Sequence, residues 1–271
     1  MLKDITIGQY IAGNSPVHKA DARMKLVLTV LLVIVLFMLK TPLSYGIFVC
    51  FTVFTVLLSR VPIPYFIKGL KPMMFIILFT VILNLFFTPG NAVWSLKLFA
   101  LNIKITDKGI FMSITMFLRL TLLVIITSLL TLTTTPMQLT DAIERLLKPL
   151  GKIKVPYHEI AMMMSIAIRF IPTFAEETDK IIKAQKARGA DFESGNLVRR
   201  AKAMIPLLVP LFVSAFRRAD ELATAMDARC YNGGINRTSM KQMKMVKSDY
   251  ITGIICIIFS AGLLIIQQII R

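Results

Sequence analysis

The chain has 271 residues, of which 56% are apolar and only 17% are charged, and its mean hydropathy is +0.71. A soluble domain carries about a quarter charged residues, so this composition excludes an ordinary soluble domain and favours an integral membrane protein. The 32 Lys and Arg outnumber the 15 Asp and Glu, which leaves a formal net charge of +17. Membrane proteins usually carry such an excess on their cytoplasmic side.

Five apolar runs predict five transmembrane helices, at residues 26–39, 43–58, 73–87, 110–132 and 251–270. The first three runs have 14 to 16 residues, fewer than the roughly 20 that cross the hydrocarbon core. Lys25, Lys40 and Lys71 are therefore expected to lengthen these spans by snorkelling. We predict an all-α integral membrane protein with about five transmembrane helices.

The distribution of basic residues predicts the orientation. With the N-terminus inside, twenty-six Lys and Arg lie on the inner side of the predicted spans and five on the outer side. This bias places the N-terminus in the cytoplasm and the C-terminus outside. The expected parts are a cytoplasmic segment, four transmembrane helices, a cytoplasmic coupling domain and a final transmembrane helix, at residues 1–25, 26–132, 133–250 and 251–271.

The segment 133–250 carries apolar residues at helical spacing among many charges, which is typical of amphipathic helices. A short helix is expected at 140–147 and two long ones at 157–188 and 197–229. Pro172 is expected to kink the first long helix, and Pro206 and Pro210 to break the second. Their apolar faces are expected to contact a membrane partner or lipid, with packing on each other as the alternative; the candidate contact residues are Phe170, Phe174, Leu208, Leu211 and Phe216.

The sequence carries no signature of catalysis or of a resident cofactor. It contains no glycine-rich phosphate loop followed by Lys and Ser or Thr, and its cysteines match no zinc or redox spacing. No carboxylate lies in a predicted span, which disfavours a carrier coupled to protons or sodium. Arg119 is the one charged residue within the predicted spans, and we expect its role to be structural.

A six-residue motif occurs twice, 41 residues apart. Ala-x-x-Ala-Arg-small ends the first long amphipathic stretch at 184–189 and the second at 225–230. One arginine at a helix end is explained by the helix dipole. Two matching copies instead favour a pair of binding sites, formed by Ala187, Arg188, Gly189, Ala228, Arg229 and Cys230.

These motifs carry a resemblance to a known family. Together with Arg169 to Pro172, Glu176, Glu177 and the run from Asp21 to Leu26, they resemble the transmembrane T component of energy-coupling factor (ECF) transporters. These transporters are bacterial and archaeal importers of vitamins and metal ions. The resemblance covers nearly the whole chain. Ala22 stands where the family often has Pro, and Cys230 replaces the commoner Gly of the second motif.

The resemblance implies a non-catalytic scaffold in a bacterial or archaeal cell membrane. Its Arg188 and Arg229 tips would bind two cytoplasmic ABC-type ATPases, and its apolar faces would hold a substrate-binding membrane subunit. ATP hydrolysis by the partners would then drive uptake, and the chain itself would need no cofactor.

Two other functions are weighed against this one. A self-contained secondary transporter or channel is disfavoured because no carboxylate lies in a predicted span. The second is a membrane-anchored protein that binds anionic lipid or nucleic acid through its basic segment. Nineteen basic and twelve acidic residues in 133–250 leave only +7, with few aromatic residues. No nucleic-acid partner is therefore expected.

Overall fold

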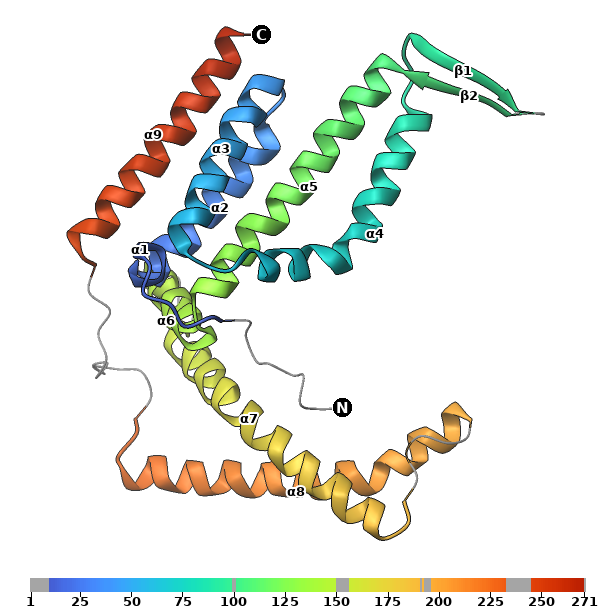
Figure 1. Ribbon diagram of the computed structural model, residues 1–271. Coiled ribbons are helices and arrows are strands. Elements are labelled where there is room, and N and C mark those ends of the chain that lie inside the picture. The colour runs from blue at the N-terminus through green and yellow to red at the C-terminus, as the bar shows by residue number, and fades with distance from the viewer. Residues whose placement is uncertain are drawn as a thin grey trace. The chain divides into compact units, whose positions relative to one another are not determined.

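The computed structural model describes residues 10–98, 101–149, 156–190, 192, 196–232 and 245–270 (Figure 1). These residues divide into two units, which are described separately. The described residues before 140 and after 244 form a helix bundle, and those between 140 and 232 form a second unit. Residues 1–9 of the predicted N-terminal segment and residues 233–244 of the predicted coupling domain lie outside the described residues.

The bundle contains one short helix and five long ones. They are α1 (Pro16–Lys19), α2 (Ala22–Met38), α3 (Pro42–Ser59), α4 (Ile63–Phe87), α5 (Asp107–Thr133) and α9 (Lys247–Ile269). Local chemistry explains where several of them begin. The Asp21 side chain accepts a hydrogen bond from the Arg23 N–H at the start of α2, and Thr106 does the same for Gly109 at the start of α5.

The predicted class of an all-α membrane protein is confirmed. Four described helices, α3, α4, α5 and α9, are long and apolar enough to cross a membrane. The first predicted span corresponds to α2, whose 17 residues make a helix about 26 Å long at 1.5 Å per residue. That length is slightly less than the hydrocarbon thickness of about 30 Å.

The helix α4 begins ten residues before the third apolar run. It runs from Ile63 through Pro72 to Phe87 and changes direction along its length (Figure 1). A proline inside a helix removes one backbone hydrogen bond and crowds the preceding turn, so the helix bends without ending. The 25 residues of α4 exceed the number that a perpendicular span requires.

A β-hairpin between α4 and α5 is a feature of the bundle that the sequence did not predict. Its strands, β1 (Ala92–Leu98) and β2 (Leu101–Thr106), pair antiparallel, with Ala92 opposite Thr106 and Leu98 opposite Leu101. Thr106 both ends β2 and caps α5, and its hydroxyl also donates to the Thr88 carbonyl at 2.9 Å. The hairpin is thereby tied to the end of α4.

The bundle core lies where α2, α3, α5 and α9 meet. It consists of large apolar side chains that are almost fully buried: Val35, Leu36, Leu39, Tyr45, Phe48, Leu122, Ile126 and Leu263. Outside this core the helices expose apolar side chains, as Phe75 of α4 does with 77% of its surface. Exposed apolar surface of this extent fits a lipid environment.

The second unit contains two long helices, α7 (Tyr157–Ala187) and α8 (Leu197–Ala228). It also contains the part of α6 (Pro136–Leu147) from Thr140 onward. The predicted breaks at Pro206 and Pro210 are wrong, because α8 continues through both prolines. The helix α7 likewise continues through Pro172. Each proline removes one hydrogen bond, and the intact turns on either side keep the helix going.

Candidate functional site

The first Ala-Arg-Gly motif forms the C-terminal cap of α7. Ala187 is the last helical residue, Arg188 is the C-cap, and Gly189 has a left-handed backbone with φ +87°. The Gly189 N–H donates to the Lys186 carbonyl at 3.0 Å, and the Ala190 N–H donates to the Gln185 carbonyl at 3.0 Å. This pair of bonds is the Schellman motif, which satisfies the last carbonyls of a helix.

The second motif forms the same cap at the end of α8. The Cys230 N–H donates to the Asp227 carbonyl at 2.9 Å, and the Tyr231 N–H donates to the Met226 carbonyl at 3.0 Å. Cys230 occupies the position of Gly189 and also has a left-handed backbone, with φ +55°. The repeated sequence therefore produces a repeated structure, with Arg188 and Arg229 at equivalent positions.

Both arginines of these tips are exposed. Among the described residues, neither guanidinium makes an ion pair. Each lies at the negative end of a helix dipole, which stabilises a cation there by about 0.3–1 kcal/mol. Their planar donor groups remain available for a carboxylate of another protein.

The helices α7 and α8 cross each other, and a polar contact joins them near the crossing (Figure 1). The Glu177 carboxylate accepts hydrogen bonds from the Ser214 hydroxyl and, at 3.1 Å, from the Arg218 guanidinium. That guanidinium also lies over the ring of Phe174, 5.9 Å from its centroid. Charged, polar and aromatic contacts thus hold the two helices together.

The five residues predicted to contact a membrane partner differ in how far they are buried. Phe170 and Phe174 are half-buried and pack edge to face, with ring centroids 5.9 Å apart, beside the Glu177–Arg218 pair. Leu211 is also half-buried, whereas Leu208 and Phe216 are exposed, Phe216 over 70% of its surface.

An exposed apolar face follows one side of α8, and we call it the α8 face. Its residues recur at helical spacing and are largely exposed: Met204, Ile205, Leu208, Val209, Phe212, Val213 and Phe216. Four of these residues were not among the predicted contact residues, although their spacing of i, i+4 and i+8 indicates one helix face: Met204, Ile205, Val209 and Val213. A contiguous exposed apolar surface of this kind is typical of a contact with another protein or with lipid.

Comparison with known proteins identifies the family. A family model described as cobalt transport protein matches residues 13–240. The energy-coupling factor transporter transmembrane protein EcfT of Ruminiclostridium cellulolyticum is 53% identical over 269 residues, with 99% of each chain covered. The proteins of that name from Clostridium kluyveri and Bacillus subtilis are 51% and 48% identical over 259 and 250 residues, with 92% or more of each chain covered. The chain belongs to the family of ECF transporter transmembrane proteins. The resemblance seen in the motifs is confirmed.

In this ECF transporter component, Lys25 departs from its predicted role. It was expected to snorkel at a membrane surface, but only 9% of it is exposed. Its Nζ donates to the carbonyls of His18 and Thr133, both at 3.0 Å, and contacts the Thr134 hydroxyl at 3.5 Å. The prediction was wrong because Lys25 lies inside α2, where α1 and the end of α5 enclose it and provide acceptors.

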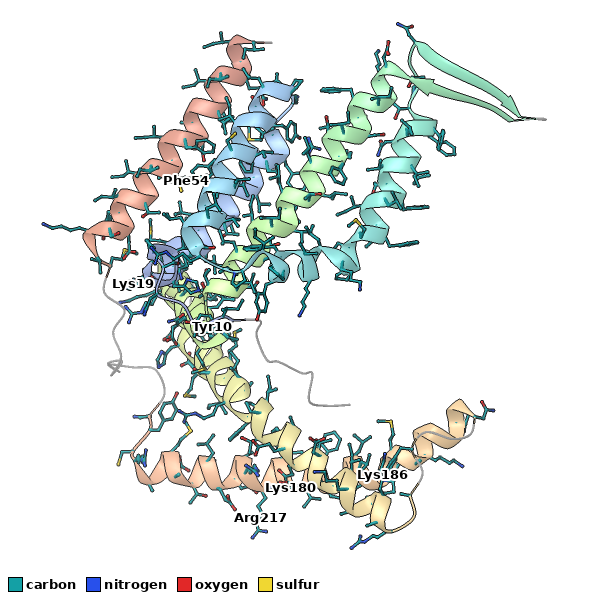
Figure 2. The ribbon with its side chains drawn as sticks, viewed as in Figure 1. Tyr10, Lys19, Phe54, Lys180, Lys186 and Arg217 are labelled. Atoms are coloured by element: carbon teal, nitrogen blue, oxygen red, sulfur yellow. The ribbon has the colours of Figure 1, made fainter. Side chains whose placement is uncertain are left out.

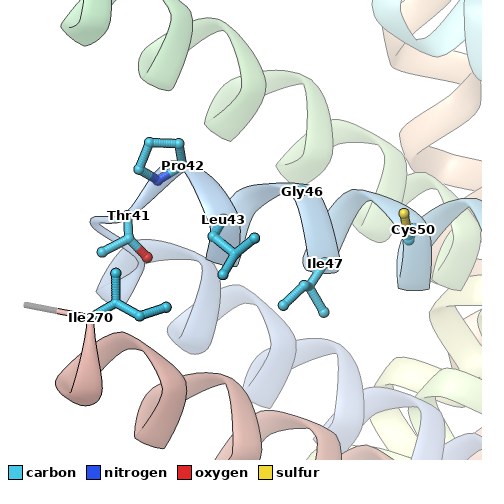
Figure 3. Close-up of a pocket in the computed structure, with 7 residues that line it drawn as sticks. All are labelled: Thr41, Pro42, Leu43, Gly46, Ile47, Cys50 and Ile270. Carbon is cyan, nitrogen blue, oxygen red and sulfur yellow. The ribbon is translucent and has the colours of Figure 1, made fainter.

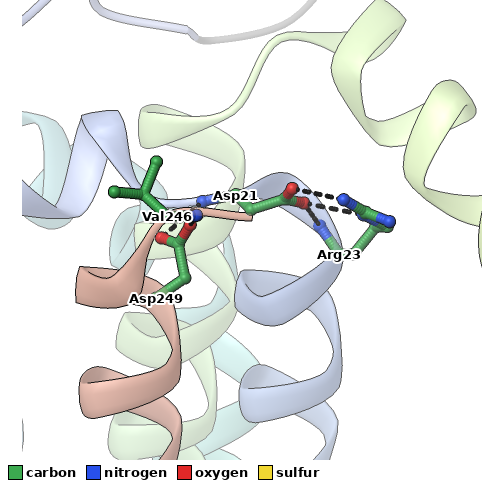
Figure 4. A network of polar contacts seen from close by, with 4 residues as sticks. All are labelled: Asp21, Arg23, Val246 and Asp249. Carbon is green, nitrogen blue, oxygen red and sulfur yellow. Dashed lines mark hydrogen bonds and ion pairs between the residues drawn. The ribbon is translucent and has the colours of Figure 1, made fainter. Parts of the chain in front are cut away.

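A polar network beside Lys25 joins the starts of α2 and α9 (Figure 4). The buried Asp249 carboxylate accepts from the Asp21 N–H at 3.1 Å and from the Val246 N–H at 2.9 Å. The Asp21 carboxylate in turn holds the Arg23 guanidinium at 2.7 Å. The network is a junction between two helix starts, because the Asp249 carboxylate at the start of α9 binds the N-cap residue of α2.

The imidazole of His18 completes the junction. Its Nε2 lies 3.0 Å from the Ile11 carbonyl and its Nδ1 lies 2.7 Å from the Ser15 hydroxyl. Because a carbonyl only accepts, Nε2 carries the proton and Nδ1 accepts from Ser15. Burial lowers the pKa of His18, which favours this neutral form.

Arg119 joins α5 to the turn between α2 and α3. Its Nε and one terminal nitrogen donate to the Tyr45 hydroxyl at 3.1 and 2.8 Å, and the same terminal nitrogen donates to the Leu39 carbonyl at 3.2 Å. Leu39 is the C-cap of α2, so the cation satisfies the end of a neighbouring helix. These contacts support the expected structural role of Arg119.

A shallow apolar groove lies between α3 and the end of α9 (Figure 3). Its lining comes from one turn after another of α3 and from the last described residue: Thr41, Pro42, Leu43, Gly46, Ile47, Cys50 and Ile270. A side chain in place of Gly46 would meet no atom within 4 Å. Among the described lining residues, Thr41 and Cys50 are the two whose side chains carry an oxygen or sulfur atom.

Proposed function

We propose that this ECF transporter component is the scaffold through which ATP hydrolysis by two cytoplasmic ABC-type ATPases drives uptake of a vitamin or a metal ion. The observation that carries the proposal is the pair of equivalent tips, each with an exposed arginine at the C-cap of a long helix. The chain itself is non-catalytic in this mechanism. The positive-inside bias supports a cytoplasmic location for both tips.

Each tip fits a partner groove that carries a carboxylate. The left-handed residue after each arginine turns the chain away from the helix axis, so the helix end and its guanidinium are presented together. A guanidinium can bind a carboxylate through two parallel hydrogen bonds, which ammonium cannot reproduce. The Glu177–Arg218 contact then links the two helices, so that movement of one tip is passed to the other.

The membrane partner would select the substrate and bind at the α8 face. Leu208 and Phe216 belong to this face, and Leu211 is half-buried in the same helix. Phe170 and Phe174 of α7 pack on each other near the place where α7 crosses α8. The exposed apolar residues of α8 have no described neighbour that covers them. Burial of these side chains against a hydrophobic subunit would contribute a favourable free energy of about 25 cal/mol for each Å² of apolar surface removed from water.

The tips are tested by replacing Arg188→Ala and Arg229→Ala together in the assembled transporter. Truncating one partner of a buried charge pair costs about 2–5 kcal/mol, so we expect the ATPases to dissociate and ATP-driven uptake to stop. Lysine at either position should restore binding poorly, because it lacks the planar donor group. Co-purification of the ATPases and uptake into vesicles are the measurements.

Arg217→Ala is the matched control for this experiment. Arg217 is an exposed arginine of α8 (Figure 2) that pairs with Glu221 at 3.5 Å one turn away. An exposed pair of this kind contributes at most about 0.5 kcal/mol, so ATPase binding and uptake should be preserved. Normal ATPase binding in the double alanine variant would contradict the proposed role of the tips.

The α8 face is tested by Leu208→Asp. A buried carboxylate at the contact should weaken capture of the substrate-binding subunit while the ATPases remain bound. Thr224→Asp, at an exposed polar position of the same helix, is the control and should leave both contacts intact. Equal loss of both partners from the Leu208 variant would indicate unfolding and would count against this surface.

A further inference from the structure

The helices α3 and α9 meet at an aromatic stack, and a groove or cavity between them lies on either side of it. The rings of Phe51 and Phe259 are stacked with their centroids 4.0 Å apart and an interplanar angle of 16°. On the side nearer the N-terminal ends of α2 and α9, a cavity of about 240 Å³ lies among α1, α2, α3, α5 and α9. We call it the α3–α9 cavity.

The α3–α9 cavity opens toward the lipid-facing surface of the bundle. Phe54 and Leu58 of α3 and Ile255 of α9 line it and are also exposed, Phe54 over 61% of its surface (Figure 2). Deeper lining comes from Leu28 and Ile126, which belong to the buried interior. Since an apolar cavity of about 150 Å³ binds benzene, this one can hold a stretch of hydrocarbon chain that enters from the bilayer.

One end of the cavity is polar, and its buried charges are already satisfied. Lys25 and Asp249 line that end, but Lys25 donates to backbone carbonyls and Asp249 accepts from backbone N–H groups. Two lysines adjoin lining residues of the cavity in the sequence, and we call them the rim lysines. Lys19 is the last residue of α1 and precedes the lining residue Ala20, and Lys247 is the first residue of α9 and precedes the lining residue Ser248.

Both rim lysines are exposed, and neither makes an ion pair with any residue that the structure describes. Tyr250, one turn into α9, is exposed as well. Lysine and tyrosine together are typical of the headgroup level of a membrane. Basic residues between helices at that level attract anionic lipid headgroups.

We propose that the α3–α9 cavity binds an anionic phospholipid, with one acyl chain inside the cavity and the headgroup phosphate at Lys19 and Lys247. The cavity supplies a hydrocarbon slot that opens to the bilayer, and the rim lysines supply two cations without a carboxylate partner among the described residues. A zwitterionic lipid could place the same chain in the slot, but its headgroup would gain much less from two lysines. The inference depends on the membrane location of the chain and is independent of the ATPase contacts.

The test uses a single tryptophan as a probe of the full-length chain in lipid vesicles. Trp94 is the one tryptophan of the chain, so Trp94→Phe with Phe54→Trp leaves a probe at the mouth of the cavity. The vesicles contain phosphatidylcholine with a small fraction of brominated phosphatidylglycerol or, in a parallel series, brominated phosphatidylcholine. Bromine quenches tryptophan fluorescence on contact, so the relative quenching gives the lipid preference.

We expect phosphatidylglycerol to be preferred at this probe by several-fold, up to about twenty-five-fold if each lysine contributes roughly fivefold. Lys19→Gln with Lys247→Gln should abolish this preference and leave quenching by phosphatidylcholine unchanged. Phe75→Trp on α4 is the matched control, because Phe75 is exposed and does not line the cavity.

Three results would overturn the proposal. They are equal quenching by the two lipids at position 54, an equal preference at position 75, and a preference that survives the double glutamine substitution. Lys19 and Lys247 are exposed and lie outside the core, so their replacement should leave the fold intact.

Discussion

Gly189 and Cys230 occupy the same position in two equivalent helix caps but differ in conformational cost. Both have a positive φ, which glycine adopts readily and other L-residues adopt at a cost of about 1–2 kcal/mol. A side chain on Gly189 would meet no atom within 4 Å, so no steric contact explains the glycine. The backbone conformation alone favours it.

This difference predicts opposite effects for two substitutions. Gly189→Ala should lower the free energy of opening the first tip by about 1 kcal/mol, and Cys230→Gly should raise that of the second by a similar amount. Hydrogen exchange of the Ala190 and Tyr231 amides, whose bonds close the two caps, measures both values.

Gly262→Ala provides the control, because Gly262 also has open space around it but lies inside α9 without a positive φ. Alanine is the better helix former there, so this substitution should stabilise or leave the helix unchanged. Destabilisation at all three positions would count against the backbone explanation.

At the scale of elements, polar side chains join helix ends that are remote in sequence. Lys25 connects the start of α2 with the end of α5, and Asp249 connects the start of α9 with the start of α2. Arg119 connects the middle of α5 with the end of α2. These bonds satisfy carbonyls and N–H groups that the helices leave unpaired at their ends. An unpaired backbone group costs several kcal/mol in the hydrocarbon of a membrane, so about this much is avoided at each bond that lies there.

The Arg119 contact predicts energetic coupling with Tyr45. Arg119→Gln should lower the free energy of unfolding by about 1.5–3 kcal/mol, because charged hydrogen bonds to Tyr45 and Leu39 are lost. Tyr45→Phe should cost about 1 kcal/mol, and the double variant should cost less than the sum. Unfolding of the chain in mixed micelles gives the three values.

Lys40→Gln is the control for this cycle, since Lys40 is an exposed basic residue at the same turn. Its replacement should change the free energy of unfolding by less than about 0.5 kcal/mol. If the two substitutions change the free energy of unfolding in a strictly additive way, Arg119 and Tyr45 are not coupled. That result would contradict a stabilising bond between α5 and the turn.

At the scale of the whole molecule, the distribution of charge predicts the orientation in the membrane. The natural Cys230 is exposed at the second tip and serves as an inner reporter once Cys50 and Cys256 are replaced by alanine. Asn91→Cys, in a chain without the three natural cysteines, places a reporter before the hairpin on the predicted outer side.

A membrane-impermeant maleimide applied to intact cells should label the Asn91→Cys variant but not the chain that keeps Cys230, and permeabilisation should make Cys230 reactive. The expected reason is the excess of Lys and Arg on the inner side of the predicted spans. Labelling of Cys230 in intact cells would show that the orientation is the reverse of the predicted one. The tips would then lie outside the cell, where they could not contact a cytoplasmic ATPase.

The sequence alone determined the helical membrane class, the approximate position of the spans, the two long amphipathic helices and the paired Ala-Arg motifs. These features depend on hydropathy, helical periodicity and the chemistry of helix ends, which are all properties of neighbouring residues. The equivalence of Gly189 and Cys230 followed from the same local pattern, and both residues close their helices as that pattern implies.

Only the tertiary structure decided which polar groups meet and which surfaces stay open. Lys25 donates to Thr133, more than a hundred positions away, as well as to His18, so its hydropathy and its sequence neighbours could not distinguish a buried cation from a snorkelling one. Whether the prolines of α8 bend or interrupt the helix depends on the packing of the turns around them, and the α3–α9 cavity is lined by five helices from distant parts of the sequence. Contacts between distant segments depend on three-dimensional packing, which local sequence patterns do not encode.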